Sequence, residues 1–217
     1  MAMEEKESAS YDTLYELGQV HQRELGNGKF LYTRIDEERK VNLNLVAKEV
    51  LERLPGFNPE IAEKVADSPL KPFQLKEQLL LIDGISEETF LQCKDFVTVH
   101  TEGKVNVNTA GHQVLIALGC EEDLSKLIED FRNGVDRVPA TQDDGIFENT
   151  DEILTKLSSF SGLSEQQQLL LAQLVNGGWL TVESKNFSLE IKTEWLDRPL
   201  FKYWVIVDKD RIKQWRE

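Results

Sequence analysis

The stretch K-V-N-L-N-L-V-A-K-E-V-L-E-R-L at residues 40–54 decides the fold, because residues 104–118 repeat it as K-V-N-V-N-T-A-G-H-Q-V-L-I-A-L. The two stretches lie 64 residues apart and share seven identical residues in register. Each is followed by a second related stretch, P-F-Q-L-K-E-Q-L-L-L-I-D-G-I-S-E at 72–87 and I-F-E-N-T-D-E-I-L-T-K-L-S-S-F-S-G-L-S-E at 146–165. Internal similarity of this kind predicts one structural unit that is used twice.

Each copy passes from a strand pattern to a helix pattern. Valines or leucines alternate with asparagines, as in a strand, and apolar residues then recur at helical spacing. We predict that the second asparagine of each pair, Asn44 or Asn108, caps the following helix by accepting a backbone N–H. The Asn-x-Asn pairs are therefore interpreted as structural rather than catalytic.

Three helix–turn–helix joints share one pattern, in which a glycine ends one helix and a capping residue starts the next. The pairs are Gly56 with Asn58, Gly84 with Ser86, and Gly162 with Ser164. Further helices are predicted at 122–132, 150–159 and about 164–175 from the spacing of their apolar residues.

Strand patterns flank the helical stretch. Residues 11–25 suggest a short helix, and residues 29–35 then alternate as a strand. The polar residues 36–39 read as a hairpin turn before the alternation resumes at 41–43. From Leu180 onward the sequence again alternates, as in a β meander.

The predicted fold class is α+β, with a small antiparallel sheet and a large, internally duplicated helical domain inserted into it. The predicted domains are residues 1–45 for the first part of the sheet core, 46–179 for the inserted helical domain with its two repeats, and 180–217 for the C-terminal β meander.

The composition of the chain argues against nucleic-acid binding and against a membrane-spanning segment in this sequence. The chain has 25 Lys and Arg against 39 Asp and Glu, a net charge of −14, which opposes binding to a phosphate backbone. No apolar run is long enough to cross a membrane. Cys93 and Cys120 lack metal-ligand spacing and read as two buried thiols, although a disulfide remains open if the compartment is oxidising.

The search for reactive groups assigns no catalytic, cofactor-binding or metal-binding residue. His21, His100 and His112 lack the neighbours of a metal site or a nucleophile motif. The acidic loop at 141–151 is rich in oxygen ligands but lacks EF-hand spacing, so a calcium ion between Asp143 and Asp151 stays open. An enzyme of unrecognised type that uses this loop is a further alternative, supported by composition alone.

A nucleic-acid-binding helix-hairpin-helix module is the main alternative. Such modules present the backbone N–H groups of a Gly-apolar-Gly turn to phosphate. Here Asn58, Ser86 and Ser164 replace the second glycine, and Glu60 and Glu165 lie close by. The substitutions and the negative charge argue against nucleic acid as a partner.

The order of motifs resembles a known family. The motifs are Y-D-T-L at 11–14, R-I-D-E-E-R-K-V-N-L-N at 34–44, P-F-Q-L-K-E-Q-L-L-L-I-D-G-I-S at 72–86, F-V-T-V-H-T-E-G-K-V-N-V-N-T-A at 96–110, and a β-rich tail ending in Q-W-R-E. From about residue 11 to the end, the chain resembles the periplasmic part of general secretion pathway protein K, a minor pseudopilin of the bacterial type II secretion system.

The resemblance implies a pilin-like core with a helical insertion, and a non-enzymatic subunit that caps or nucleates the pseudopilus tip. It implies the minor pseudopilins I and J as partners, and the periplasmic face of the bacterial inner membrane as the location. Members carry an N-terminal membrane helix, which we do not find in this sequence, so we interpret the chain as a trimmed soluble fragment. Metal binding is associated with the family, but no ligand can be mapped onto this sequence.

Overall fold

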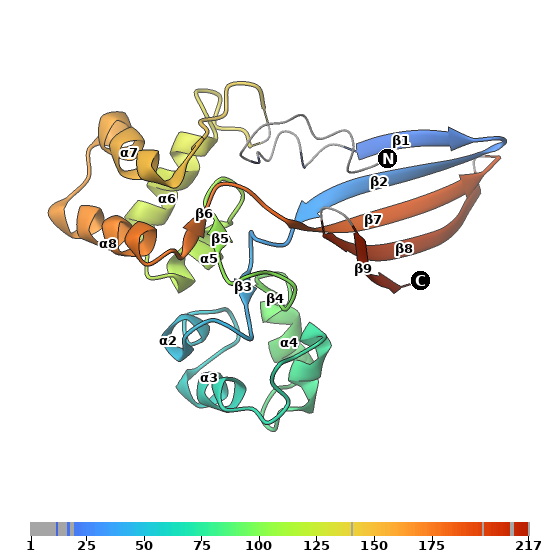
Figure 1. Ribbon diagram of the computed structural model, residues 1–217, viewed down its shortest axis with the longest axis horizontal. Helices are drawn as coiled ribbons and strands as arrows, with labels where there is room; N and C mark the ends of the chain where they lie inside the picture. Colours follow the sequence, from blue (N-terminus) through green and yellow to red (C-terminus); the bar gives the residue numbers. More distant parts are fainter. Residues whose placement is uncertain are drawn as a thin grey trace.

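The computed structural model describes Asp12, Leu17 and residues 20–139, 141–196, 198–208 and 211–216. Three bodies meet near the centre of the molecule, namely one sheet and two helical units (Figure 1). Within the described residues, no helix combines the length and the hydrophobicity that a bilayer crossing requires. The α+β class expected from the sequence is confirmed.

The sheet has five antiparallel strands in the order β1-β2-β7-β8-β9. They are β1 (Val20–Leu25), β2 (Gly28–Asp36), β7 (Asn186–Trp195), β8 (Arg198–Asp208) and β9 (Arg211–Arg216). Since β2 and β7 are neighbours, both helical units lie within the connection between two adjacent strands. The predicted C-terminal meander is confirmed, and its first strand continues the sheet of the N-terminal strands.

The predicted N-terminal hairpin is wrong. β2 pairs with β1 through a turn at Gly26, whose φ of +61° favours glycine, and not with residues 41–43. The helix expected at 11–25 gives way to β1 from Val20, and most of its earlier part lies outside the described residues. Residues 36–38 are no exposed turn either, because their side chains point into the centre of the molecule.

The two helical units share one plan and confirm the duplication. The first contains β3 (Val41–Asn42), α2 (Lys48–Leu51), α3 (Pro59–Ala66), η1 (Lys76–Leu81), α4 (Glu87–Cys93) and β4 (Val97–Thr98). The second contains β5 (Val105–Asn106), α5 (His112–Ala117), α6 (Glu122–Arg132), η2 (Thr150–Glu152), α7 (Ile153–Ser161), α8 (Glu165–Asn176) and β6 (Leu180–Thr181). In each unit the first and last strands form a short parallel pair.

The asparagines do not cap helices as predicted. The N-cap residues of α2 and α5 are Ala47 and Gly111, and neither makes a side-chain capping bond. The Asn108 amide instead binds both backbone groups of Phe147, accepting from its N–H at 3.0 Å and donating to its C=O at 2.8 Å. Asn44 binds the backbone of Phe73 in the same way, at 2.7 and 2.9 Å.

We call the contact of Asn108 or Asn44 with a phenylalanine backbone the Asn clamp, and each clamp has a second asparagine beside it. Asn42 accepts a hydrogen bond from the N–H of Asn44 at 2.8 Å, and Asn106 accepts one from Asn108 at 3.0 Å. The first asparagine thereby holds a turn that aims the second at the middle of its unit. The Asn-x-Asn pair closes each unit around a buried phenylalanine, which explains why both copies keep it.

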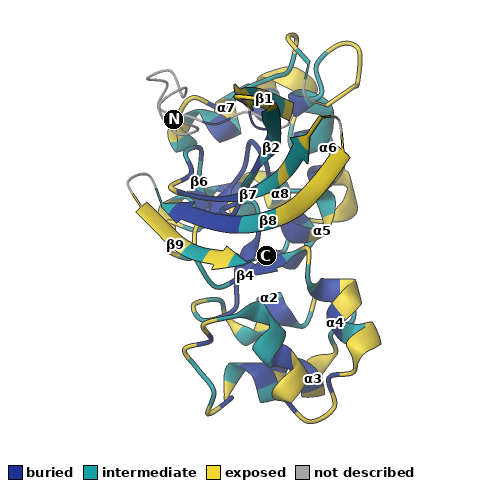
Figure 2. Cartoon of the chain, turned by 90° about the vertical axis from the view of Figure 1, so that its right-hand side faces the viewer, coloured by how far each residue is buried: buried dark blue, intermediate teal, exposed yellow. Residues whose placement is uncertain are grey.

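The joints were predicted correctly. The side chains of Asn58 and Ser86 accept from backbone N–H groups in the first turns of α3 and α4, and Ser164 forms a capping box with Gln167. Apolar residues from both units form one buried cluster, while the sheet has a smaller cluster of its own. In Figure 2 buried residues are dark blue in the helical part and in the sheet. Both cysteines are free and buried, as the interpretation of two ordinary thiols expected.

Candidate functional site

Three consecutive carboxylates lie where the sheet meets the two helical units. Asp36, Glu37 and Glu38 are only 2%, 2% and 5% exposed. Carboxylates are rarely this buried unless hydrogen bonds or opposite charges compensate for the lost hydration. The partners of the three side chains come from different bodies of the molecule, so this junction determines how those bodies are arranged.

Asp36 holds the second helical unit. Its carboxylate accepts hydrogen bonds from the Thr109 hydroxyl at 2.5 Å and from the Asn106 amide at 3.1 Å. It also accepts from the backbone N–H of Glu38 at 2.7 Å. Burial raises the pKa of Asp36 to about 6, although these hydrogen bonds favour the ionised form.

Glu37 holds the first helical unit and the sheet together. It accepts from the Thr98 hydroxyl at 2.6 Å and from the Ser188 hydroxyl at 2.8 Å. Lys40 completes the group with an ion pair at 2.6 Å. Burial alone would raise the pKa of Glu37, but the Lys40 ammonium and the hydrogen bonds outweigh it, so this pKa lies below its usual value. Glu37 is therefore ionised across the physiological range.

Glu38 turns toward β7. Its carboxylate accepts from the Asn186 amide at 2.7 Å and from the Asn186 backbone N–H at 3.2 Å. Burial, followed by the negative charge of Asp36, raises the pKa of Glu38 to about 7. Its backbone carbonyl accepts from the N–H of Asn106 at 2.8 Å, which attaches the second unit at the same point.

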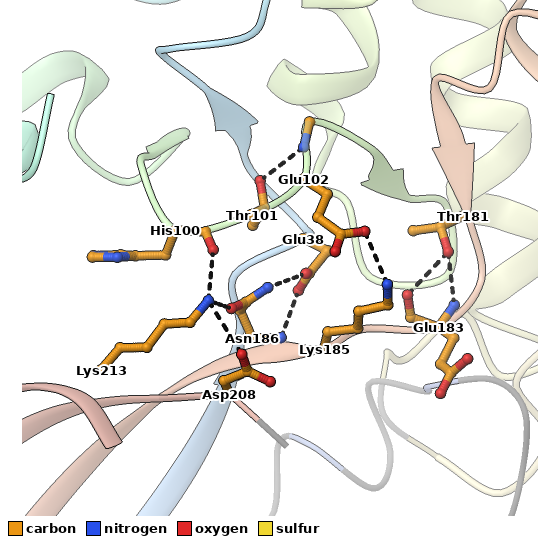
Figure 3. A network of polar contacts seen from close by, with 11 residues as sticks. Glu38, His100, Thr101, Glu102, Thr181, Glu183, Lys185, Asn186, Asp208 and Lys213 are labelled. Carbon is orange, nitrogen blue, oxygen red and sulfur yellow. Dashed lines mark hydrogen bonds and ion pairs between the residues drawn. The ribbon is translucent and has the colours of Figure 1, made fainter. Parts of the chain in front are cut away.

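Ion pairs surround this buried group (Figure 3). Lys213 donates to the Asn186 side chain at 2.6 Å and to the His100 carbonyl at 3.4 Å, and it pairs with Asp208 at 3.5 Å. Lys185 pairs with Glu102 at 2.9 Å. Since His100 lies just after β4, in the connection between the two units, these contacts join β9 to the helical part.

A second contact fixes β9 against η1. Arg216 donates to both carboxylate oxygens of Glu77, at 2.9 and 3.3 Å, and lies 5.7 Å from the Trp204 ring centre. A two-point guanidinium–carboxylate contact specifies orientation as well as distance. The C-terminal strand is thereby tied to the first unit.

Two of the three histidines contact neighbouring residues of the fold. The His112 ring shares a hydrogen bond with the Ser125 hydroxyl at 2.9 Å, and its Nε2 donates to the Glu122 carboxylate at 3.0 Å. Ser125 is completely buried, so its hydroxyl cannot meet a substrate, and the group joins α5 to α6. His21 lies in β1 and stacks on Tyr32 with ring centres 4.9 Å apart.

The acidic loop is held by its own backbone. Asp143 accepts from the N–H groups of Val135 and Asp136 at 2.8 and 3.2 Å, and from the Thr141 hydroxyl at 2.7 Å. Among the described residues, no three His, Cys, Asp or Glu side chains are gathered as metal ligands would be.

The two glycine turns of the first unit differ in their surroundings. A Cβ on Gly56 would lie 2.9 Å from the Gln92 side chain, so this turn packs against α4. Beside Gly84 lies Lys64, which pairs with Asp83 at 3.3 Å. The first turn is therefore covered by packing inside the unit. Gly84 is exposed, and the cation beside it is paired with Glu60 and Asp83.

One face of the sheet carries an aromatic row. Register places Phe201, Tyr203 and Trp215 on the same face, and the Tyr203 ring centre lies 6.0 Å from that of Phe201 and 5.1 Å from that of Trp215. Phe201 and Trp215 are 51% and 54% exposed, whereas Val205 further along β8 is buried. We call the three aromatic residues the aromatic row.

Sequence reasoning missed the junction. The polar residues 36–39 predict a hairpin turn, whereas all the buried side-chain partners of the three acids except Lys40 lie about 60 to 150 positions away in the chain. The only local signal was three acids directly before a repeat, and this pattern is also common in exposed loops.

Comparison with known proteins agrees with this architecture. The helix-hairpin-helix motif family matches residues 36–98, which span the first helical unit. A chain of the GspK-GspI-GspJ complex from the type 2 secretion system of enterotoxigenic Escherichia coli superposes with a TM-score of 0.65 at 15% identity. That match covers 96% of this chain and 87% of the other. No curated protein sequence matches the chain significantly.

Proposed function

We propose that this chain, which has a GspK-like minor pseudopilin fold, is a non-enzymatic subunit at the tip of a type II secretion pseudopilus. It would cap or nucleate the filament by binding the minor pseudopilins I and J, at the periplasmic face of the inner membrane. In this role it supports protein export across the outer membrane. The solved relative is a GspK-GspI-GspJ complex, which supports the choice of partners.

The position of the helical units carries the proposal. Both units are inserted between β2 and β7 at one end of the sheet, and they extend far beyond the strands (Figure 1). A further subunit that approached this end would meet the helical body instead of a sheet. A filament that ends with this chain would therefore stop growing in that direction.

The aromatic row gives the sheet a contact surface for such partners. Large exposed aromatic side chains contribute strongly to protein interfaces because they bury much apolar area at a low entropic cost. The row lies on the sheet, whereas the helical units occupy its other end, so docking here would leave the helical body free.

The test mixes the chain with the periplasmic domains of its own pseudopilins I and J at tens of micromolar and measures co-elution by size-exclusion chromatography with light scattering. A stable complex is expected, and Phe201→Ser with Trp215→Ser should weaken it at least tenfold. Leu169→Ser is the matched control, because Leu169 is 62% exposed but lies on α8. Absence of any complex with the wild-type chain would refute the proposal.

Nucleic acid binding is the second candidate, because the helix-hairpin-helix match covers the first unit. The net charge of −14 opposes it, and the turn at Gly56 packs against α4. A mobility shift with duplex DNA at low salt separates the two functions. We expect no shift at concentrations that give full complex formation with the pseudopilins.

A further inference from the structure

The two helical units build the same joint differently. In each unit a glycine with a positive φ lies in the turn after the first helix, Gly56 after α2 and Gly119 after α5. The last helix of each unit, α4 or α8, starts from a serine cap and packs beside that turn. The duplication therefore allows one unit to be compared with the other, position by position.

The joint of the first unit is filled by a side chain. A Cβ on Gly56 would lie 2.9 Å from the Gln92 carboxamide oxygen and 3.0 Å from the Thr89 carbonyl oxygen. Gln92 stands six positions after Ser86, the cap of α4. The turn and the helix are therefore in direct contact.

The joint of the second unit is hollow. Leu170 holds the same position in α8, six residues after Ser164, but its nearest methyl group lies 3.9 Å from where a Cβ on Gly119 would be. A pocket of about 220 Å³ opens here, and Leu124 at its base is fully buried. In another protein, an apolar cavity of about 150 Å³ holds a benzene molecule. The pocket therefore has room for one leucine-sized side chain.

Leucine and glutamine side chains form the rim of this pocket. Leu169 lines it and is 62% exposed. Gln166 donates to the Glu121 carboxylate at 3.0 Å. The Gln173 side chain also lines the pocket and has no hydrogen-bond partner among the described residues, so its amide can bind a peptide backbone. Exposed apolar surface beside a pocket with a few polar groups is typical of a binding site.

The surroundings of the pocket are acidic. Four acids occupy the caps and first turns of α6 and α8, the two helices beside it, namely Glu121, Glu122, Asp123 and Glu165. Arg53 beside Gly119 and Lys126 in α6 supply two positive charges. Residues 46–179 contain 11 Lys and Arg against 23 Asp and Glu, so they carry −12 of the net charge of −14. A basic partner is therefore favoured over an acidic one.

We propose that this pocket binds a leucine-sized apolar side chain of a partner protein, in a segment where lysine or arginine flanks that side chain. Leu124 and the leucines of α8 cover the apolar group, the Gln173 amide binds the partner's backbone, and the acids attract its cations. Helix α8 lies on the side of the helical body away from the sheet (Figure 1). The site is separate from the aromatic row, so the inference does not depend on the proposed function.

The test uses the chain with carbon-13 in its leucine methyl groups, titrated with a peptide that has one leucine between pairs of lysines. Shifts should concentrate on Leu169, Leu170 and Leu124. We expect a dissociation constant of about 1 mM or tighter, because a single anchor supplies only part of an interface. Replacing the peptide's leucine by serine, or its lysines by glutamates, should weaken binding about tenfold or more.

The duplication supplies a matched control. Leu169→Ser should weaken binding of the peptide about tenfold. Leu91→Ser should leave binding unchanged. Leu91 holds the same position in α4, five residues after the cap, and is 52% exposed, but it lies beside the filled joint. Since Leu169→Ser should not weaken the complex with the pseudopilins, failure of this inference and failure of the proposed function can be distinguished.

Several results would overturn the inference. They are the absence of shifts at the α8 leucines up to about 5 mM peptide, equal binding of the serine or glutamate peptide, and equal losses in Leu169→Ser and Leu91→Ser. Light scattering of the chain alone tests a second copy as the occupant. A concentration-dependent dimer that Leu169→Ser abolishes would also overturn the inference, because the pocket would then belong to a contact between copies.

Discussion

The Asn clamp of the second unit gives the sharpest test of the packing. Asn108→Ala removes both hydrogen bonds between this side chain and the backbone of Phe147, which is fully buried. The Phe147 ring stacks on Phe131 with centres 4.6 Å apart, so the loop that carries it has little freedom to find new partners. The N–H and C=O of Phe147 would then be left without their partners.

The magnitude follows from the two bonds and their burial. A hydrogen bond contributes about 1 kcal/mol net, and a buried group left unpaired costs about 1–3 kcal/mol. Asn108 is 4% exposed, so we expect its loss to cost about 3 kcal/mol. Asn44→Ala breaks the equivalent bonds at a partly exposed site, where water replaces part of the loss, and should cost about 2 kcal/mol.

Urea unfolding followed by far-ultraviolet circular dichroism measures both values, with an unchanged slope as the sign that the unfolding transition is the same. Asn108→Asp is the matched comparison. It keeps an acceptor for the Phe147 N–H but turns a buried carboxylate oxygen toward the Phe147 C=O, so it should be no more stable than the alanine variant. A cost below about 1 kcal/mol for Asn108→Ala would refute the clamp, since two buried bonds cannot be that weak together. So would a larger cost for Asn44→Ala.

Three further predictions concern the thiols, the pH dependence of stability and the C-terminal strand. Burial raises the pKa of Cys93 to about 11 and that of Cys120 to about 12, so a thiol reagent should label neither until denaturant is added; rapid labelling of the native chain contradicts this. The raised pKa of Glu38 means that its stabilising contribution is complete below the unfolded value and is lost as pH rises through about 7. Calorimetry should therefore show that the wild-type chain loses about 2–3 kcal/mol more stability between pH 5 and pH 8 than Glu38→Gln loses. Parallel pH profiles of the two proteins would contradict this prediction. Arg216→Ala breaks a partly exposed pair with Glu77 and should cost only about 0.5–1 kcal/mol, while exchange of the β9 amides rises; unchanged β9 exchange would count against the tie.

Features that depend on local sequence were predicted well. The caps at Asn58, Ser86 and Ser164 and the strand pattern of β7 each depend on residues a few positions apart, and the duplication follows from comparing the sequence with itself. The N-terminal hairpin failed because β3 is only two residues long and pairs with β4, whose residues lie more than 50 positions later. Alternation indicates a strand but does not identify its partner.

The functional residues were harder to predict. The role of Asn44 and Asn108 depends on backbone groups 29 and 39 positions away, which no local pattern indicates. The acids at 36–38 look like a solvated turn because charged residues are seldom buried without partners, and their partners are distant in the sequence. The domain limits of 1–45, 46–179 and 180–217 stay a prediction; strand β2 ends at Asp36, and β7 begins at Asn186.

The place where the helical units leave the sheet has a consequence for engineering. Asp36 lies directly opposite Phe187 in the register of β2 and β7, so the chain departs and returns at adjacent positions. In topological terms, everything between them is one very long hairpin loop. A short connector could replace it without altering the order of the strands, and a different globular body could be grafted onto the same two ends. The helical body and the sheet can therefore be exchanged separately, which would let related chains vary the helical body while they preserve the sheet.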